Sequence, residues 1–182
     1  MSFEFTLLDA LQALRCPVLD ALAAFFDQAG AHGEIWIAFT AVLLAFRRPR
    51  RAGLAMALAL GLYMLAGHCA LKPLFARPRP CDLRPEMLTL VARPHGWSFP
   101  SGHTSSAFAA AFALWLQNRR LGVPALVLAG FIGFTRMYLY VHFPTDILGG
   151  VALGLAVGAC GSLLADKISN KWAKRSEVKR TV

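Results

Sequence analysis

The sequence predicts an all-α, polytopic membrane protein, and three observations support that prediction. Of the 182 residues, 57% are hydrophobic and 16% are charged. The apolar residues come in blocks of about twenty, which is the length that a helix needs to cross a bilayer. Lysine and arginine gather at the ends of these blocks. A soluble domain of this length would instead spread its apolar residues over amphipathic helices or alternating strands.

Residues 1–16 are predicted to form a separate N-terminal segment. Within them, residues 3–14 alternate apolar and polar side chains at helical spacing but are too few to span a bilayer, which indicates a helix lying in the membrane interface. Glu4 and Asp9 interrupt the apolar residues and no basic leader precedes them. We therefore do not expect a cleavable signal here.

Pro17 restarts the chain, and the membrane domain is expected over residues 17–166. An amphipathic helix over about 18–29, a bend at 30–33 and a spanning piece over about 33–46 fit the apolar pattern. The bend leaves open whether this stretch makes one span or two helices at different depths. Further spans are expected at about 52–72, 101–118, 123–140 and 146–164.

Basic residues predict which way the chain faces. Arg47–Arg51, Arg119-Arg120 and the tail, residues 167–182, follow alternate crossings and so lie on one side. The positive-inside rule makes that side cytoplasmic. The loop 73–100 and the turn 142–145 then face outward. Such loops account for the net charge of +9, and no basic stripe on a soluble element indicates a nucleic-acid partner.

Three short sequence segments, here called strings, lie at the outward ends of the spans. They contain the groups needed to bind a phosphate and transfer it to a nitrogen nucleophile. The strings are Lys72–Pro80, Pro100–His103 and Arg136–Asp146. Phosphoryl transfer depends on fixed positive charge around the phosphate and on an in-line nucleophile. Because all three strings border apolar segments, the phosphate is expected on a lipid.

Lys72, Arg79 and Arg136 are the predicted cations. Lys72 alone would more often be a lysine snorkelling at a helix end, and Arg79 alone could be loop charge. Arg136 lies inside an apolar helix, where a charge is costly and usually functional. Ser101 and Gly102 open the next predicted helix, whose free N–H groups form a ready anion site.

Two histidines and a carboxylate complete this set. His103 follows the helix start, and His142 precedes Asp146 by four residues. Asp146 is close enough in sequence to accept a hydrogen bond from the imidazole, which would fix its tautomer and make it a nucleophile or a base. Alone, His142 would more often be an interfacial polar residue. The other histidines are interpreted as core (His68) or loop (His32, His95) residues, and Arg77, Arg84 and Arg93 are weighed evenly between headgroup contact and loop charge.

The sequence predicts no metal and no other cofactor. Its His, Asp and Glu residues have no metal-site spacing, and the four cysteines form no CxxC pair and no expected disulfide framework. The cations of the predicted site are side chains.

These strings resemble the motifs of the type-2 phosphatidic acid phosphatase superfamily, which includes bacterial acid phosphatases and vanadium haloperoxidases. The family pattern KxxxxxxRP, PSGH and SRxxxxxHxxxD is matched in order and spacing over about residues 17–165. Thr135 replaces the usual serine and keeps the hydroxyl. The resemblance implies a core of six helices and a metal-independent lipid phosphatase.

The resemblance also implies a role for each residue of the motifs. His142 would be the nucleophile that forms a phosphohistidine, and Asp146 would orient it. His103 would be the general acid for the leaving group and would then activate water. The phosphate would be held by Lys72, Arg79, Ser101, the Gly102 amide and Arg136.

The short, spanning build is similar to bacterial undecaprenyl-diphosphate phosphatases and phosphatidylglycerophosphate phosphatases. We expect undecaprenyl diphosphate as substrate, cleaved at the periplasmic or exterior face of the bacterial plasma membrane. The alternatives are a phosphatidic acid, phosphatidylglycerophosphate or lipid A phosphatase. Two alternatives come from other functional classes. A haloperoxidase-like oxidase is disfavoured because such enzymes are soluble and this chain has predicted membrane spans. A non-catalytic lipid-phosphate binder or transporter is disfavoured because binding alone would not need the two histidines. The sequence predicts no particular oligomeric state.

Overall fold

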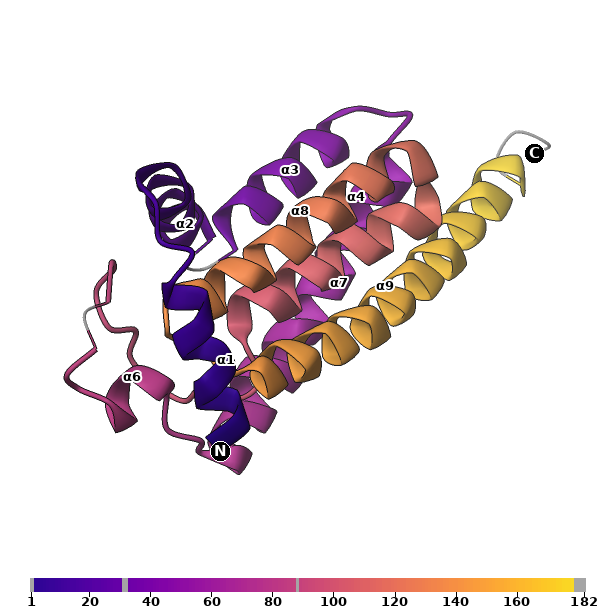
Figure 1. Cartoon of the computed structure of the whole chain (residues 1–182). Helices are drawn as coiled ribbons and strands as arrows, with labels where there is room; N and C mark the ends of the chain where they lie inside the picture. The colour runs from indigo at the N-terminus through magenta and orange to yellow at the C-terminus, as the bar shows by residue number, and fades with distance from the viewer. Residues whose placement is uncertain (1, 31–32, 88, 179–182) are drawn as a thin grey trace.

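The computed structural model describes residues 2–30, 33–87 and 89–178 (Figure 1). Over these ranges the chain forms helices and no strand, which confirms the predicted all-α class. His32, most of the predicted bend and the last four residues of the predicted tail lie outside the described residues. The stretch that the sequence left open, 18–46, forms two separate helices.

Six longer helices make up the body of the described chain, and shorter elements join them. The longer ones are α2 (Pro17–Gly30), α3 (Glu34–Ala45), α4 (Arg50–Tyr63), α7 (Gly102–Gln117), α8 (Arg119–Tyr138) and α9 (Pro144–Val178). The shorter ones are α1 (Ser2–Gln12), the π-helix η1 (Met64–Leu71), α5 (Lys72–Phe75) and α6 (Pro80–Leu83). A helix over most of 1–16 agrees with the sequence, and its interfacial position stays a prediction.

Helix α7 is the central helix of the bundle, packed against α4, α8 and α9 (Figure 1). It is rich in alanine, and most of its alanines have no exposed surface. Small side chains let neighbouring helices approach closely, which gives van der Waals contact where lipid offers no hydrophobic drive between helices. The first turn of α7, which holds the PSGH string, is thereby fixed by three neighbours.

Glycines on α9 bring its backbone against α7. Gly150, Gly154 and Gly158 recur every four residues and share one helix face. A Cβ atom at Gly154 would lie 2.8 Å from the carbonyl oxygen of Ser105, and one at Gly158 would lie 2.9 Å from that of Ala109. Such contacts exclude any larger residue. They place the first turns of α7 and α9 side by side.

Within the described residues, three helices are long and apolar enough to cross a membrane: Arg50–Leu83, Arg119–Tyr138 and Pro144–Trp172. They coincide with the predicted spans at 52–72, 123–140 and 146–164. The spans predicted at 33–46 and 101–118 correspond to the shorter α3 and α7. With 12 and 16 residues, α3 and α7 are shorter than the about 20 residues that a spanning helix needs.

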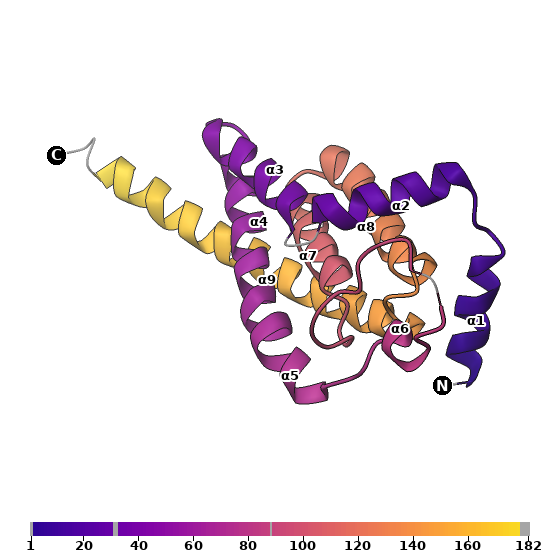
Figure 2. The same ribbon diagram turned by 90° about the vertical axis from the view of Figure 1, so that its left-hand side faces the viewer.

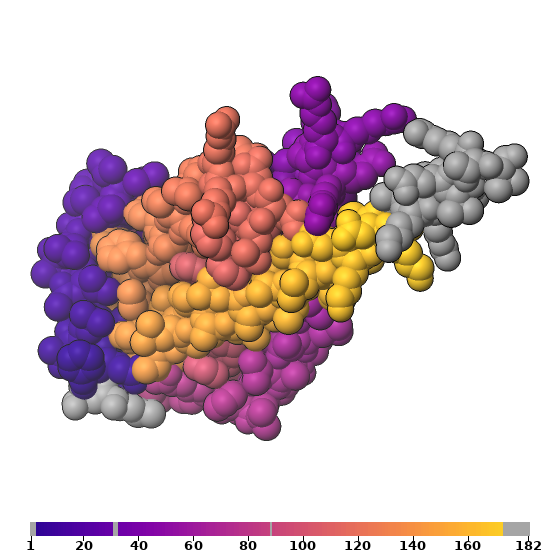
Figure 3. Space-filling model, turned by 90° about the vertical axis from the view of Figure 1, so that its right-hand side faces the viewer, coloured from indigo at the N-terminus to yellow at the C-terminus, as the bar shows by residue number. Residues whose placement is uncertain are grey.

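The two ends of the bundle differ in chemistry. At one end, Arg51 of α4 pairs with Asp166 of α9 (Nη2–Oδ1, 2.7 Å), and Gln117 of α7 donates to the same carboxylate at 2.7 Å. The basic strings around residues 47–51 and 119–120 lie there. In Figure 3, α9 runs along one face of the molecule between the two ends, and Figure 2 shows its C-terminal part extending past the other helices. The opposite end carries the three phosphate-directed strings.

The close contact between α9 and α7 predicts a steric difference between two glycines. Gly154→Ala would place a Cβ 2.6 Å from that of Phe108, whereas a Cβ at Gly130 on α8 meets no atom within 4 Å. Both changes gain about 1 kcal/mol of helix propensity, but overpacking costs about 1–3 kcal/mol. We expect Gly154→Ala to lower the melting temperature in detergent and Gly130→Ala to leave it unchanged or raise it. Equal melting temperatures would contradict this packing.

Candidate active site

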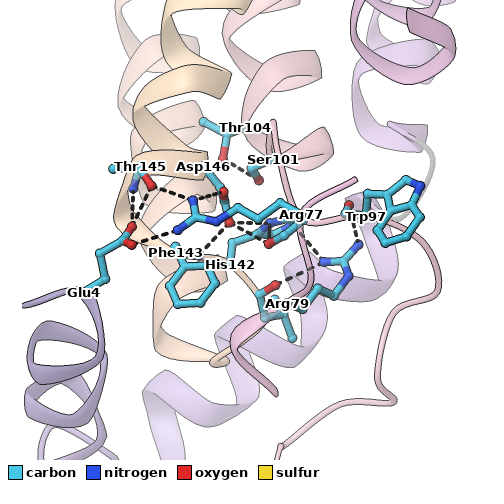
Figure 4. A network of polar contacts seen from close by, with 12 residues as sticks. Glu4, Arg77, Arg79, Trp97, Ser101, Thr104, His142, Phe143, Thr145 and Asp146 are labelled. Atoms are coloured by element: carbon cyan, nitrogen blue, oxygen red, sulfur yellow. Dashed lines mark hydrogen bonds and ion pairs between the residues drawn. The ribbon is translucent and has the colours of Figure 1, made fainter. Parts of the chain in front are cut away.

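His142 lies at the centre of a polar network where α7, α8 and α9 meet the loop 76–101 (Figure 4). Its side chain is only 3% exposed. The Nε2 atom lies 3.1 Å from Nη1 of Arg79, and the Nδ1 atom lies 3.2 Å from the hydroxyl of Ser98. The structure thus brings residues of the first and third strings together with Ser98, which lies just before the second string.

The hydrogen bonds of His142 indicate its tautomer. A guanidinium only donates hydrogen bonds, so the Nε2 atom that faces Arg79 must accept. The imidazole proton then sits on Nδ1 and points to Ser98, whose hydroxyl donates to Oδ2 of Asp146 at 2.6 Å. The lone pair of Nε2 is left directed at the cationic groups. That is the arrangement a nitrogen nucleophile needs.

Asp146 acts on His142 mainly through Ser98. Its Oδ2 atom lies 3.6 Å from Nδ1, which is too long for the direct hydrogen bond that the sequence suggested. Oδ2 accepts from the backbone N–H of Phe143 at 2.8 Å as well as from Ser98. The carboxylate is fully buried, so these donors hold it in one orientation.

The imidazole of His142 is neutral at ordinary pH. Burial lowers the pKa of His142 to about 3, with the charges of Arg79 and Lys72 adding to the effect and Asp146 opposing it. The direction follows because burial and neighbouring cations both disfavour the imidazolium form. A neutral ring keeps the Nε2 lone pair unprotonated, so it can form a bond when a phosphate takes the place of Arg79 as its partner.

Arg79 and Lys72 contact mainly neutral backbone oxygens. Arg79 donates to the carbonyls of Val141 (3.1 Å) and Gly96 (3.0 Å), and Lys72 donates to that of Trp97 at 2.6 Å. A phosphate would make stronger, charge-assisted bonds with the same donors. Both cations can therefore exchange these partners for an anion.

Arg136 is fully buried and meets a carboxylate that the sequence did not single out. Its Nη1 atom donates to Oδ1 of Asp27 on α2 at 2.6 Å, and its Nε and Nη2 atoms donate to the hydroxyl of Thr135. The Nε2 atom of His103 lies 3.3 Å from the backbone oxygen of Asp27. Helix α2 thus closes the Arg136 side of the site.

The start of α7, predicted to be an anion site, lies beside Asp146 and Lys72, and its binding of a phosphate stays a prediction. The N–H of Ser101 donates to the carbonyl of Asp146 at 3.1 Å, and its hydroxyl accepts from Thr104 at 3.0 Å. A Cβ at Gly102 would lie 3.0 Å from the Tyr63 hydroxyl and 3.8 Å from Cε of Lys72. A glycine there lets the helix terminus lie beside Lys72.

Two site residues were missed because no motif pattern contains them: Ser98 and Asp27. Asp27 did carry a signal, since it is a carboxylate within a mostly apolar helix, where a charge usually has a function. The arginines weighed for headgroup contact have other partners: Arg77 pairs with Glu4, Arg84 with Asp9, and Arg93 donates to the carbonyl of Pro85. His68 is exposed, so its interpretation as a core residue was wrong.

The sequence model of the PAP2 superfamily matches residues 48–169. The chain belongs to this superfamily. It is 26% identical over 155 residues (85% of the chain, 74% of the relative) to an undecaprenyl-diphosphatase of Sulfolobus acidocaldarius. It is 35% identical over 145 residues (79% and 78%) to a decaprenylphosphoryl-5-phosphoribose phosphatase of Mycobacterium tuberculosis.

A solved structure supports the same conclusion. The transmembrane PAP2-type phosphatidylglycerolphosphate phosphatase of Bacillus subtilis matches with a TM-score of 0.72 and 27% identity, over 93% of this chain and 86% of that one. Together with the apolar helices, this similarity makes the chain a membrane protein. The chain is therefore a PAP2 lipid phosphatase, an enzyme, as the motifs predicted.

Ser98 should matter for the chemical step of this PAP2 phosphatase. Ser98→Ala removes the bridge between Nδ1 of His142 and Asp146, so we expect kcat to fall by about tenfold or more, with KM little changed. The matched control is Ser162→Ala, another buried serine whose partner, Gln117, lies at the far end of the bundle. Steady-state kinetics with a lipid phosphate would measure both. Equal effects would mean that the Ser98 bridge has no specific role.

Proposed function

We propose that this PAP2 phosphatase hydrolyses undecaprenyl diphosphate to the monophosphate through a phosphohistidine on His142, at the outward membrane surface. The observation that carries the proposal is the neutral, buried imidazole whose Nε2 lone pair faces Arg79. A protein that only bound the lipid phosphate would need the cations but no such nitrogen.

In the first step, Nε2 of His142 attacks the terminal phosphorus, and the bond from phosphorus to the bridging oxygen breaks. The leaving group is the lipid monophosphate, which takes a proton from His103 acting as general acid. Lys72, Arg79 and Arg136 offset the charge that spreads over the equatorial oxygens. At the start of α7, the Gly102 amide adds a backbone N–H donor and Ser101 adds its hydroxyl.

In the second step, His103 accepts a proton from water as the water oxygen attacks the phosphorus. The P–N bond breaks, inorganic phosphate leaves, and His142 returns to its neutral form. While the phosphate is attached, the ring carries positive charge. Asp146 stabilises that charge through the hydroxyl of Ser98.

The polyprenyl substrate is supported by the names of two relatives and by the position of the site. An undecaprenyl-diphosphatase and a decaprenylphosphoryl-5-phosphoribose phosphatase, by their names, both act on polyprenyl phosphates. The candidate site lies at the ends of the apolar helices α8 and α9, so a lipid could keep its tail in the bilayer and place only its headgroup among the cations. The phosphatidic acid, phosphatidylglycerophosphate and lipid A reactions are the competing outcomes of the test.

The outward orientation is supported by charge. The end of the bundle opposite the candidate site carries the arginines of residues 47–51 and 119–120, together with Lys167 and Lys171 of α9. The positive-inside rule favours placing that end in the cytoplasm. The candidate site would then face the periplasm or the exterior of a bacterial plasma membrane.

Phosphate release from a lipid panel tests the proposed reaction. Purified protein in detergent with EDTA should act on undecaprenyl diphosphate with a kcat/KM at least about tenfold above that for phosphatidic acid, phosphatidylglycerophosphate and lipid A. His142→Ala should abolish release, because it removes the nucleophile, and the matched control His68→Ala should retain it. A preference for another lipid would mean that the proposed substrate is wrong. Full activity of His142→Ala would refute the mechanism.

Cysteine labelling tests the orientation. In a cysteine-free background, an impermeant maleimide added to intact cells should label Glu86→Cys, exposed in the loop after α6, because that loop should face outward. It should miss Asn170→Cys, exposed near the end of α9. Permeabilised cells, in which both positions react, provide the control. The reverse pattern would place the site in the cytoplasm.

A further inference from the structure

Arg77 connects the N-terminal helix to Asp146. Its Nη1 atom donates to Oδ1 of Asp146 at 2.6 Å and to the hydroxyl of Thr145 at 2.6 Å. Its Nη2 atom donates to Oε2 of Glu4 on α1 at 2.8 Å. Figure 4 shows Arg77 lying between Glu4 and Asp146. One guanidinium thus joins two carboxylates that lie far apart in the sequence.

The network holds Arg77 on several sides. Its guanidinium carbon lies 4.1 Å from the ring centroid of Phe143, a stacking contact that fixes the plane of the fork. Glu4 also accepts from the hydroxyl of Thr145, at 2.6 Å through Oε1. The side chains of Arg77 and Glu4 are 19% and 13% exposed, so solvent screens the pair only partly. The geometry is therefore more rigid than that of a surface ion pair.

The two oxygens of Asp146 have different donors. Oδ2 faces Ser98 and the N–H of Phe143, on the His142 side, whereas Oδ1 accepts from Arg77. The backbone carbonyl of Arg77 also accepts from the N–H of Ser98 at 2.8 Å. Arg77 therefore holds both partners on which the Nδ1 side of His142 depends.

We propose that Glu4 and Arg77 are positioning residues of the active site, through which α1 fixes Asp146 and sets the basicity of His142. This inference rests on the proposed role of His142 as the nucleophile. The N-terminal helix would then be a working part of the enzyme in addition to any membrane contact it makes.

The charge of Arg77 predicts in which direction the pKa of His142 should move when Arg77 is replaced. The positive charge of Arg77 offsets part of the negative charge of Asp146. Asp146 therefore stabilises a protonated His142 less than it would without Arg77. The other groups facing the imidazole are Arg79, Lys72 and Ser98, which stay in place when Arg77 is replaced. Without Arg77, the pKa of His142 should rise, because the full charge of Asp146 then favours the imidazolium form.

A second arginine, Arg84, provides a matched control, because its partner Asp9 lies on α1 as Glu4 does. Arg84 donates to Oδ2 of Asp9 on α1 at 2.8 Å and stacks over the ring of Phe5 at 4.0 Å. The Asp9 carboxylate also accepts from the hydroxyl of Tyr140 at 2.7 Å. This second pair ties α1 to the same loop but ends on Tyr140. Replacing it loosens α1 without removing a donor from Asp146.

The test compares Arg77→Met with Arg84→Met in steady-state kinetics and melting experiments. Arg77→Met also leaves the buried Asp146 carboxylate without its cation, so its melting temperature should fall further than that of Arg84→Met, and the kinetics are compared well below both melting temperatures. Arg77→Met should lower kcat by about tenfold or more with KM within about twofold, and should move the acid limb of the kcat/KM profile toward higher pH. Arg84→Met should keep kcat within about twofold and leave the limb in place.

Milder substitutions cover the case in which Arg77→Met does not fold. Glu4→Gln keeps Arg77 but removes its anchor, and should lower kcat several-fold more than Asp9→Asn does. Arg77→Lys should restore part of the activity lost in Arg77→Met, because an ammonium can bond Asp146 but cannot also reproduce the fork to Glu4. Equal losses in the Arg77 and Arg84 variants, or in the Glu4 and Asp9 variants, would overturn the proposal.

A vanadate measurement separates this proposal from the proposed reaction. Vanadate can take a five-coordinate form with a nitrogen ligand, so its affinity reports on His142 without any lipid. We expect Arg77→Met to raise the dissociation constant about fivefold or more, and Arg84→Met to leave it within about twofold. If the wild type released no lipid phosphate but showed this vanadate pattern, the reaction would be wrong and the positioning role would stand. If the wild type hydrolysed the lipid but all variants bound vanadate with identical affinity, the reaction would stand and the positioning role would be wrong.

Discussion

The close contact between the first turns of α7 and α9 is the constraint on which the candidate site depends. The site needs the Ser101 end of one helix and the His142 and Asp146 end of another within hydrogen-bonding distance, and a bilayer supplies no hydrophobic force to bring them there. The glycines of α9 let its backbone contact that of α7. The bond from the N–H of Ser101 to the carbonyl of Asp146 is the polar outcome of that packing.

Positive charge in a poorly solvated place is the second constraint. Arg136 is fully buried, and an unpaired guanidinium there would cost several kcal/mol. Its partners are Asp27 and the hydroxyl of Thr135, while Arg79 and Lys72 contact backbone carbonyls. The buried cations of the site thus have partners within the protein. Neutral carbonyls are weaker partners than a carboxylate, so an incoming phosphate can displace them more readily.

The sequence predicted the helical class, the spans over α4, α8 and α9 and the meeting of the three strings, because each depends on local spacing or apolar length. It did not predict Ser98 or Asp27 as site residues, and it weighed Arg77 for headgroup contact and not for its bond to Asp146. Their partners lie far along the chain: Ser98 is 44 residues from His142, and Asp27 is 109 residues from Arg136. Spacing shows which residues share a helix face, but contacts between helices depend on packing. His68 was misassigned for the same reason, since an apolar helix does not reveal which face looks outward.

Two carboxylates that complete the polar network come from outside the segment that the superfamily model matches. The match begins at residue 48, whereas Glu4 and Asp27 lie on α1 and α2. Glu4 reaches Arg77 and Asp27 reaches Arg136, so each contacts an arginine of the matched segment. The matched segment thus holds the cations and histidines, and the N-terminal helices supply the opposing charges that fix two of its arginines. Because a guanidinium binds in a planar fork, fixing it also fixes the direction in which its remaining donors point. The N-terminal helices can therefore adjust the electrostatics of the site without altering the motif residues.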